Sequence, residues 1–579
     1  MCINRYIRVG KVITAAILIG WVSLCKAQNG NHEWIKTFGQ SSNIDWVSSI
    51  AVDKNSNVYV AGSFHGTIDF DPGAGQELKT SVADQNDAYL LKLDPFGNFL
   101  WVKTFGSSSS DDIESIAVDD LGNIYFFGRT FGQVDVNPGV GVESRTGLFL
   151  VKLDASANYV WSYNIESALI EVGGPKAISV DKKGNVAICG YVAGITKFGA
   201  SGSNPQTITT VAVTPDAYVV KLDNSGKMLW YRTLGDERND GFTSVAFDNQ
   251  GNLNVIGDFA GKIDVDPSAQ VKYIESNIPS DRDGLIMQYD SLGNYNWSYV
   301  LSPSTVDCKS VAVNSSNDLY VVGNFKDSVR FDILNPNNLS ITGTNVDDDM
   351  FMLSLSQQGQ FKWAKHIKTA GLYDVLYAVA IDKNDNVYAT GEFSGSANFS
   401  NGFSKTSNGI GSDLVIWKLD KSGNTKWVNS YGSIQRELGS SITVDQNDYV
   451  YTTGVFGDSV NFGTSINKEF VTSNGGLDCF VLKLNQYPTS VEEIGVVGYF
   501  SIYPNPVKSG NEFIVEMPDN LENRMNIIWE IVSAEGKVLD SGAAANMNSI
   551  KIKAPSTAGV YFIVFNDGQE LVNQRIVVE

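Results

Sequence analysis

Residues 53–64 read DKNSNVYVAGSF, a tight polar turn followed by a strand in which large and small residues alternate. The same phrase returns six more times along the chain. Asp, Asn and Gly at the turn, with a period of two after it, predict β-hairpins rather than helices. The other copies lie at 119–130, 181–192, 248–259, 314–325, 382–393 and 445–456.

Each copy is flanked by three further strands. A tryptophan strand and then an alternating strand such as SIAVD at 49–53 precede it, and a strand such as DAYLLKL at 87–93 follows and leads into the next tryptophan strand. Four strands per repeat, in seven repeats around a channel, predict a β-propeller. Because the tryptophans recur at one position of each repeat, we expect them to pack between blades. They are Trp34, Trp101, Trp161, Trp230, Trp297, Trp363 and Trp427.

The two ends of the repeat series are complementary. The series begins with a lone tryptophan strand at 32–39 and stops after a third strand, DCFVLKLN, at 478–485. The first strand can therefore complete the last blade and remove two exposed sheet edges. The prediction is a seven-bladed propeller over 31–487, closed by its N-terminal strand. Long connections such as 65–86 would share one face, which is the expected binding face.

Composition excludes several classes of partner. The chain of 579 residues has 43 Lys and Arg against 64 Asp and Glu, a net charge of −21. This excess of negative charge argues against nucleic acid and against anionic membranes as partners. With 43% hydrophobic and 11% aromatic residues, the chain is expected to fold rather than to be disordered.

Residues 1–27 are predicted to be a signal peptide. Basic residues precede an apolar run at 12–24, and the expected cleavage lies between Ala27 and Gln28. Lipid attachment at Cys25 is the weaker alternative, because the preceding residue is leucine rather than a small residue. The apolar run is short for a membrane span, so no transmembrane anchor is expected.

No catalytic constellation is found. The three histidines are widely separated, so neither a metal site nor a catalytic triad through His65 is favoured. The cysteines beyond the signal peptide also lie far apart and predict no disulfide framework. Asp69 and Asp71 leave calcium as a minor alternative to a protein without cofactors. Trp46, placed in a loop and without a tryptophan counterpart in other repeats, is the candidate ligand contact.

One further phrase identifies the repeat. GTIDFDPGAG at 66–75, with echoes at 133–141 and 262–270, resembles the SBBP-type bacterial β-propeller repeat. The resemblance covers about 31–487 and implies a propeller. Later repeats lose the Asp-Pro-Gly turn, so a role of that turn in every blade is not implied.

The last part of the chain has a different pattern. Residues 488–498 are predicted to be a linker, and the short alternating strands of 499–579 predict a small β-sandwich. This end resembles the type A C-terminal sorting domain of the type IX secretion system of Bacteroidota, although that family usually has lysine in place of the arginine near the terminus. The resemblance rests on Tyr503, Pro504, Asn505, Pro506, Gly536, Gly559, Tyr561 and Arg575. It implies the type IX secretion machinery as partner, and a secreted or surface-attached product.

These observations predict a non-enzymatic, exported propeller that binds an extracellular protein or glycan through its long-loop face. The first alternative is a carbohydrate-active hydrolase or lyase, which a carboxylate cluster at the channel mouth would favour. The second is a structural component of a surface layer. Because one fold supports many functions, the site itself has to decide among them.

Overall fold

The computed structural model describes residues 31–39, 45–169, 174–199, 205–210, 214–276, 282–334, 340–342, 348–369, 371, 374–400, 402–463, 468–486, 501–516, 527–533, 538–544, 549–566 and 571–579. The chain forms two compact units, Met1–Tyr487 and Pro488–Glu579. Three predictions fall outside the described residues: the signal peptide with its cleavage between Ala27 and Gln28, the linker at 488–498, and the role of Gly536.

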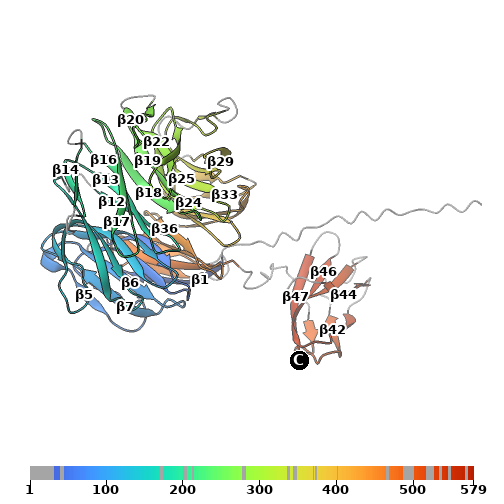
Figure 1. The fold of residues 1–579 in the computed structure, drawn as a ribbon. Helices are drawn as coiled ribbons and strands as arrows, with labels where there is room; N and C mark the ends of the chain where they lie inside the picture. Colours follow the sequence, from blue (N-terminus) through green and yellow to red (C-terminus); the bar gives the residue numbers. More distant parts are fainter. Residues whose placement is uncertain are drawn as a thin grey trace, which may run out of the picture. The chain divides into compact units, whose positions relative to one another are not determined.

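The first unit is made of antiparallel sheets, which confirms the predicted all-β class (Figure 1). The sheets are β2 (Trp46–Val52), β3 (Val58–Phe64), β6 (Asp87–Leu93) and β7 (Phe99–Phe105); β8 (Asp111–Val118), β9 (Ile124–Asp135), β10 (Ser144–Leu153) and β11 (Tyr159–Ser167), extended by β14 (Ile195–Phe198) and β15 (Gln206–Thr209); β12 (Gly174–Val180), β13 (Val186–Val192), β16 (Asp216–Leu222) and β17 (Met228–Leu234); β18 (Gly241–Phe247), β19 (Leu253–Phe259), β22 (Asp283–Tyr289) and β23 (Tyr295–Leu301); β24 (Val306–Val313), β25 (Leu319–Phe325), β28 (Asp349–Leu355) and β29 (Phe361–Ile367); β30 (Val375–Ile381), β31 (Val387–Phe393), β34 (Asp413–Leu419) and β35 (Thr425–Tyr431); and β36 (Leu438–Val444), β37 (Val450–Phe456), β40 (Asp478–Asn485) and β1 (Asn31–Phe38). In five of these sheets the four strands are hydrogen-bonded in chain order, with the tryptophan strand at one edge; in the second sheet β14 covers the tryptophan strand β11, and in the last sheet the tryptophan strand is β1 from the start of the series.

The short turns follow from the Asp that opens the repeated phrase, which is replaced by Asn314 in the fifth copy. Oδ1 of Asp53 accepts hydrogen bonds from the backbone N–H of Asn55 at 2.8 Å and of Asn57 at 3.0 Å. Ser56 then takes a left-handed φ of 60°. An Asp side chain that binds the backbone two and four residues later stabilises such a turn without any metal.

The repeated tryptophans bridge neighbouring sheets. The indole N–H of Trp230 in β17 donates to the carbonyl of Ser291, which lies in the turn between β22 and β23, at 3.2 Å. Gly293 in that turn has a φ of 85°, and a Cβ there would lie 2.8 Å from the indole. Glycine therefore satisfies both the backbone conformation and the close approach. Corresponding indole bonds join Trp34 to Pro95, Trp161 to Asn224, Trp297 to Gln357 and Trp363 to Lys421.

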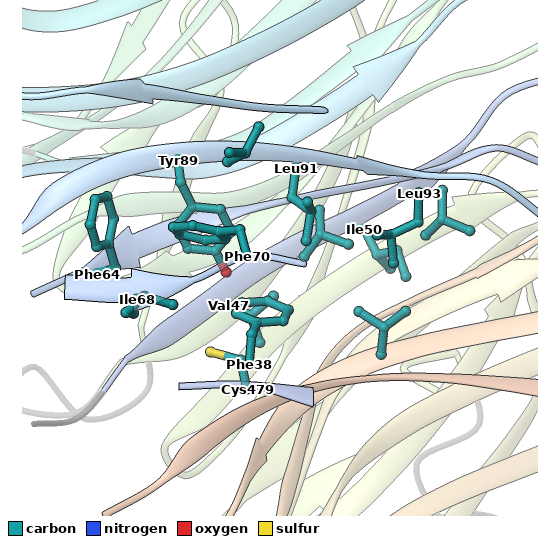
Figure 2. Packing of buried hydrophobic residues seen from close by; sticks show 14 of the residues in the cluster. Phe38, Val47, Ile50, Phe64, Ile68, Phe70, Tyr89, Leu91, Leu93 and Cys479 are labelled. Atoms are coloured by element: carbon teal, nitrogen blue, oxygen red, sulfur yellow. The ribbon is translucent and has the colours of Figure 1, made fainter. Parts of the chain in front are cut away.

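The first strands of the sheets contact one another in the order β2, β8, β12, β18, β24, β30 and β36, and β36 in turn contacts β2. The backbone N–H of Ile50 donates to Oγ of Ser441 at 3.3 Å across this last junction. At the opposite edge of the same sheet, β1 pairs with β40, so that Thr37 lies opposite Phe480. Figure 2 shows Phe38 of β1 and Cys479 of β40 packed with residues of the first sheet such as Tyr89.

Short hairpins lie between the second and third strands of the sheets. The sequence predicted long surface loops here, but these connections hold small antiparallel strands. They are β4 (Thr67–Asp69) with β5 (Leu78–Thr80), β20 (Lys262–Asp264) with β21 (Tyr273–Glu275), β26 (Ser328–Arg330) with β27 (Ser340–Thr342), β32 (Ser396–Asn398) with β33 (Ser404–Thr406), and β38 (Ser459–Asn461) with β39 (Phe470–Thr472). The pair β14–β15 and the distal parts of β9 and β10 occupy the same position. A single 3₁₀ turn, η1 (Val82–Asp84), precedes β6. We call these hairpins the arms.

The second unit contains two sheets around one core. The first sheet holds β41 (Ser501–Tyr503), β42 (Glu512–Glu516) and β45 (Ser549–Lys553), and the second holds β44 (Val538–Ala544), β43 (Ile527–Ser533), β46 (Gly559–Asn566) and β47 (Leu571–Val578). Phe513 and Ile552 of the first sheet and Ile563 and Ile576 of the second belong to the same buried cluster. In the described part of the whole chain, no helix has the length and apolar character needed to cross a membrane.

Candidate functional site

One end of the sheets collects the features that a binding site requires. Strands in these sheets are antiparallel, so the first and third strands all begin at the same end. The arms and the connections from one sheet to the next also lie at that end. We call it the arm face, and it corresponds to the long-loop face predicted from the sequence.

The Asp-Pro-Gly phrase forms the arm of the first sheet. Oδ1 of Asp69 accepts hydrogen bonds from the N–H groups of Asp71 at 3.1 Å and Glu77 at 2.8 Å. Asp135, Asp264 and Asn461 bind the backbone at the same two relative positions in other arms. These bonds give the Asp69 carboxylate a structural role in closing a hairpin. Among the described residues, no three His, Cys, Asp or Glu side chains are grouped to hold a metal ion.

Every first strand carries a β-bulge at the same position. In β2 the pairing with β3 skips from Val47 to Ser49, which leaves Ser48 without an opposite residue. A bulge redirects the extra side chain, and bulges occur often beside functional sites. The seven residues skipped in this way are half-buried and form what we call the bulge ring: Ser48, Glu114, Lys176, Thr243, Lys309, Tyr377 and Ser440.

A glycine in each second strand permits the bulge. Gly62 lies opposite Val47, and a Cβ at Gly62 would sit 2.0 Å from the carbonyl oxygen of Trp46. The corresponding distance is 2.3 Å at Gly128 and 1.9 Å at Gly257. This is the glycine of the VYVAGSF phrase, and a glycine inside a strand is a signal for a bulge or a close backbone approach. The sequence therefore held the signal for the bulge ring, but sequence reasoning did not use it.

Ion pairs surround the bulge ring at the arm face. Asp112 and Arg129 lie 2.8 Å apart, and Arg436 reaches Glu392 at 2.6 Å. Arg282 lies 3.1 Å from Asp258 and 3.5 Å from Asp307. We call these ion-paired residues the belt: its three arginines are paired with four carboxylates, so the belt is close to neutral although the whole chain is strongly acidic. A neutral or zwitterionic ligand suits such a belt better than a highly charged polymer.

Two of the three charged members of the bulge ring form no ion pair, whereas the third, Lys309, lies 3.6 Å from Asp307. Glu114 and Lys176 form no salt bridge within 4.0 Å with any residue that the structure describes. Burial raises the pKa of Glu114, and the carboxylate of Asp112 adds to the effect while Lys176 and Arg129 oppose it. Burial also raises the pKa of Asp258 to about 6 despite Arg282. Carboxyls whose pKa values are raised by burial are candidates for binding or proton transfer.

The first and last sheets provide a different sector of the arm face. Trp46 is 40% exposed, and it is the first residue of β2, so the prediction that it lies in a loop was wrong. Its carbonyl accepts a hydrogen bond from the hydroxyl of Tyr89 at 3.2 Å. The neighbouring positions hold Ser63, Leu438 and Val455 rather than charged residues. Trp46 therefore offers an aromatic surface at one side of the bulge ring, and its role as ligand contact stays a prediction.

The three histidines are well separated in the structure as well. His366 Nε2 lies 2.9 Å from Oδ2 of the buried Asp349, and His32 Nδ1 lies 3.2 Å from Glu469. His65 Nε2 lies 3.1 Å from the backbone oxygen of Asp84. Each ring nitrogen thus lies next to an oxygen of a residue that is not part of the bulge ring.

Buried carboxyls line the junctions between sheets at the arm face. Asp216 begins the third strand β16, and Asp240 immediately precedes the next first strand, β18. The backbone N–H of Asp240 donates to the Pro215 carbonyl at 2.9 Å. Burial raises the pKa of Asp216 to about 6 and that of Asp240 to about 8, with nearby carboxylates adding to the shift. Burial likewise raises the pKa of Asp413 to about 7. At a pH between the ordinary pKa of 3.8 and these raised values, the three carboxyls are protonated in the folded chain but ionised in the unfolded chain.

These carboxyls predict a pH dependence of stability. Their pKa values in the folded state exceed the ordinary value of 3.8, so the folded chain binds more protons than the unfolded chain between about pH 4 and pH 8. Stability is therefore lost as the pH rises through this window. We expect the free energy of unfolding to be at least about 2 kcal/mol larger at pH 5 than at pH 8. Chemical unfolding at both pH values measures it, and Asp240→Asn should reduce the difference; a protein more stable at pH 8 would contradict the assignment.

The sorting-motif residues meet in the second unit. Oδ1 of Asn505 accepts the backbone N–H of Val577 at 2.8 Å, so residues 72 positions apart are held together. The hydroxyl of Tyr503 donates to Glu516 at 2.8 Å, and that of Tyr561 to the Thr557 carbonyl at 2.9 Å. Backbone pairing places Gly559 opposite Val578 and Arg575 opposite Phe562.

Family comparisons match one repeat of the first unit and the C-terminal unit. Residues 33–66 match the family model described as a beta-propeller repeat, and residues 501–579 match the one described as a secretion system C-terminal sorting domain. The chain carries a type IX sorting domain. This sorting domain indicates secretion or attachment to the cell surface, which confirms the predicted localisation. It also implies an interaction with the type IX secretion machinery.

One curated relative extends the similarity over the repeats. It is described as "Uncharacterized WD repeat-containing protein L264" of Acanthamoeba polyphaga mimivirus and is 23% identical over 546 residues. The match covers 79% of this chain and 38% of the relative. The chain thus spans well under half the length of this relative.

Proposed function

We propose that this chain is an exported, non-enzymatic binding protein in which seven blades close into a ring. The cyclic contacts of the first strands, the pairing of β1 with β40 and the Ile50–Ser441 hydrogen bond support closure. A closed ring brings the seven bulged residues together around the arm-face end of the channel. The site then binds an extracellular glycan or protein.

The bulge ring is the observation that carries this proposal. Its seven side chains are of five different types, whereas the residue that permits each bulge is always glycine. A fixed backbone device with variable side chains is typical of a binding surface supported by a rigid scaffold. Glu114 and Lys176 form no salt bridge with described residues. They can therefore exchange bound water for ligand hydroxyls without first breaking an ion pair, which lowers the free-energy cost of binding.

A carbohydrate-active enzyme is the second candidate. The raised pKa values of Glu114 and Asp258 favour it, because a glycosidase needs one carboxyl that stays protonated near neutral pH. The belt argues against hydrolysis, because its carboxylates are paired with arginines and are therefore less available to act on a glycosidic bond. We therefore rank binding above hydrolysis.

The test is an array of glycans probed with the purified protein, with calcium and with a chelator, while the same polysaccharides are assayed for cleavage. Saturable binding without new chain ends is expected. The double variant Glu114→Gln, Lys176→Met should weaken binding at least about tenfold, equivalent to about 1.4 kcal/mol. Lys183→Met, in an exposed turn at the opposite end of the sheets, is the matched control. Cleavage of any polysaccharide would overturn the non-enzymatic assignment, and unchanged affinity of the double variant would overturn the site.

A further inference from the structure

A hollow of about 460 Å³ follows strand β17, away from the bulge ring. It is lined by the consecutive residues 228–233 of β17, together with Gln206 of β15 and Pro267 beyond β20. Successive side chains of a strand point to opposite faces of the sheet. Six consecutive residues share one hollow only when the hollow lies along the backbone edge of the strand. The hollow is therefore a groove at the outer edge of β17, between two arms.

The outer edge of β17 has free backbone capacity. Within its sheet β17 pairs with β16, and no other described strand pairs with it. An edge strand presents a row of N–H and C=O groups that favour pairing with a further strand. Extended peptides that bind proteins in this way obtain affinity from main-chain hydrogen bonds and specificity from pockets for alternate side chains.

The neighbouring sheet shows how such an edge is covered. There β14 adds antiparallel to the outermost strand β11, and Phe198 lies opposite Ile165. Thr196 and Phe198 of this added strand are buried, whereas Ile195 and Lys197 are exposed. The ring of Phe198 also stacks on Tyr231 of β17, with 5.1 Å between ring centroids. The groove on β17 thus begins beside a strand that already covers an equivalent edge.

Arg232 determines the chemistry of the groove. Its Nε donates to the Gly293 carbonyl at 2.9 Å and one Nη to the Tyr231 carbonyl at 2.7 Å. The guanidinium lies 5.4 Å from the Trp230 ring. It forms no salt bridge within 4.0 Å with any residue that the structure describes. A guanidinium held by two backbone carbonyls keeps donors available for a carboxylate.

We propose that the outer edge of β17 binds an extended segment of a partner protein as an added β-strand, with an acidic side chain of that segment on Arg232. Leu229, which is 50% exposed, also lines the groove and provides apolar contact for such a segment. This site is independent of the bulge ring and of the ligand proposed for it.

The test uses a labelled eight-residue peptide of alternating threonine and valine with one central glutamate. Binding is followed by fluorescence anisotropy, and hydrogen exchange with mass spectrometry locates it. We expect exchange protection in 228–234, together with a loss of affinity of about tenfold when the glutamate is replaced by glutamine or when Arg232→Gln is introduced. Lys103→Gln in β7, at the equivalent strand position, is the matched control and should leave binding unchanged.

Every other outcome counts against the proposal. Equal protection of 99–105 would show general edge pairing, and protection that grows with protein concentration without peptide would assign the edge to a second copy. If the affinity is the same for the glutamate and glutamine peptides and is unchanged by Arg232→Gln, Arg232 does not select an acidic side chain. Thermal unfolding of Arg232→Gln checks that the variant is folded, and the glutamine peptide tests the same interaction without any change in the protein.

Discussion

Removing residues 571–579 is expected to trap the protein in the periplasm as fully as removing 488–579. Strand β47 pairs with β46 from Leu571 to Val578 and supplies the buried Ile576 and Val578 to the core. Loss of one buried aliphatic side chain costs about 2–5 kcal/mol, and a small domain has only about 5–15 kcal/mol of stability in total. The truncated sorting domain should therefore not fold, and export should fail.

Cell fractionation with protease accessibility, in a host with a type IX secretion system, measures this result. Lys551→Ala, an exposed substitution in β45, is the matched control and should be exported normally. Asn505→Ala removes only the bond to the Val577 N–H, which is worth about 1 kcal/mol, so export should be reduced rather than abolished. Surface display of the truncated chain at the level of the full chain would show that a folded β47 is not needed for sorting.

Repetition made the all-β class and the strand order predictable. Alternation around Asp53 and its copies fixed the hairpins, and the recurrence of Trp230 and its copies indicated packing between units. The hairpins depend on residues that are close in sequence, and the tryptophan packing was indicated by a repeat of nearly constant length, so both could be read from the sequence. The arms were missed because strands such as Thr67–Asp69 have only three residues, too few for a period of two to be recognised.

The site was less predictable for a different reason. Arg282 contacts Asp258 and Asp307, and Arg436 contacts Glu392, so each arginine bridges residues of separate repeats. Such contacts depend on how neighbouring sheets are placed, which strand patterns within one repeat do not specify. The bulge ring is intermediate, because Gly62 and its counterparts signalled a close backbone approach without indicating which side chain it would redirect. Trp46 was correctly singled out as exposed, although its position in β2 was not foreseen.

Phe38→Ala should lower the stability of the whole propeller, not only that of its last sheet. Phe38 is 4% exposed and packs between sheets, with its ring centroid 5.8 Å from Phe70 and from Tyr89 (Figure 2). Removing a buried phenylalanine ring costs about 3–5 kcal/mol. In a closed ring, the substitution weakens the packing between the last sheet and the first. All sheets should then unfold in one cooperative transition, and its midpoint should move to a lower denaturant concentration.

Guanidinium unfolding followed by tryptophan fluorescence and by far-UV circular dichroism provides the measurement. Leu100→Ala in β7 is the matched control, since Leu100 is also on a tryptophan strand but is 46% exposed, and it should change stability by no more than about 0.5 kcal/mol. Trp34→Phe, which removes the bond to the Pro95 carbonyl and keeps an aromatic ring, should fall between the two at about 1 kcal/mol. Coincident transitions shifted together in Phe38→Ala would support a ring sealed by β1. If only a minor early transition moved, the last sheet would unfold separately and β1 would be an appendage rather than the closing strand.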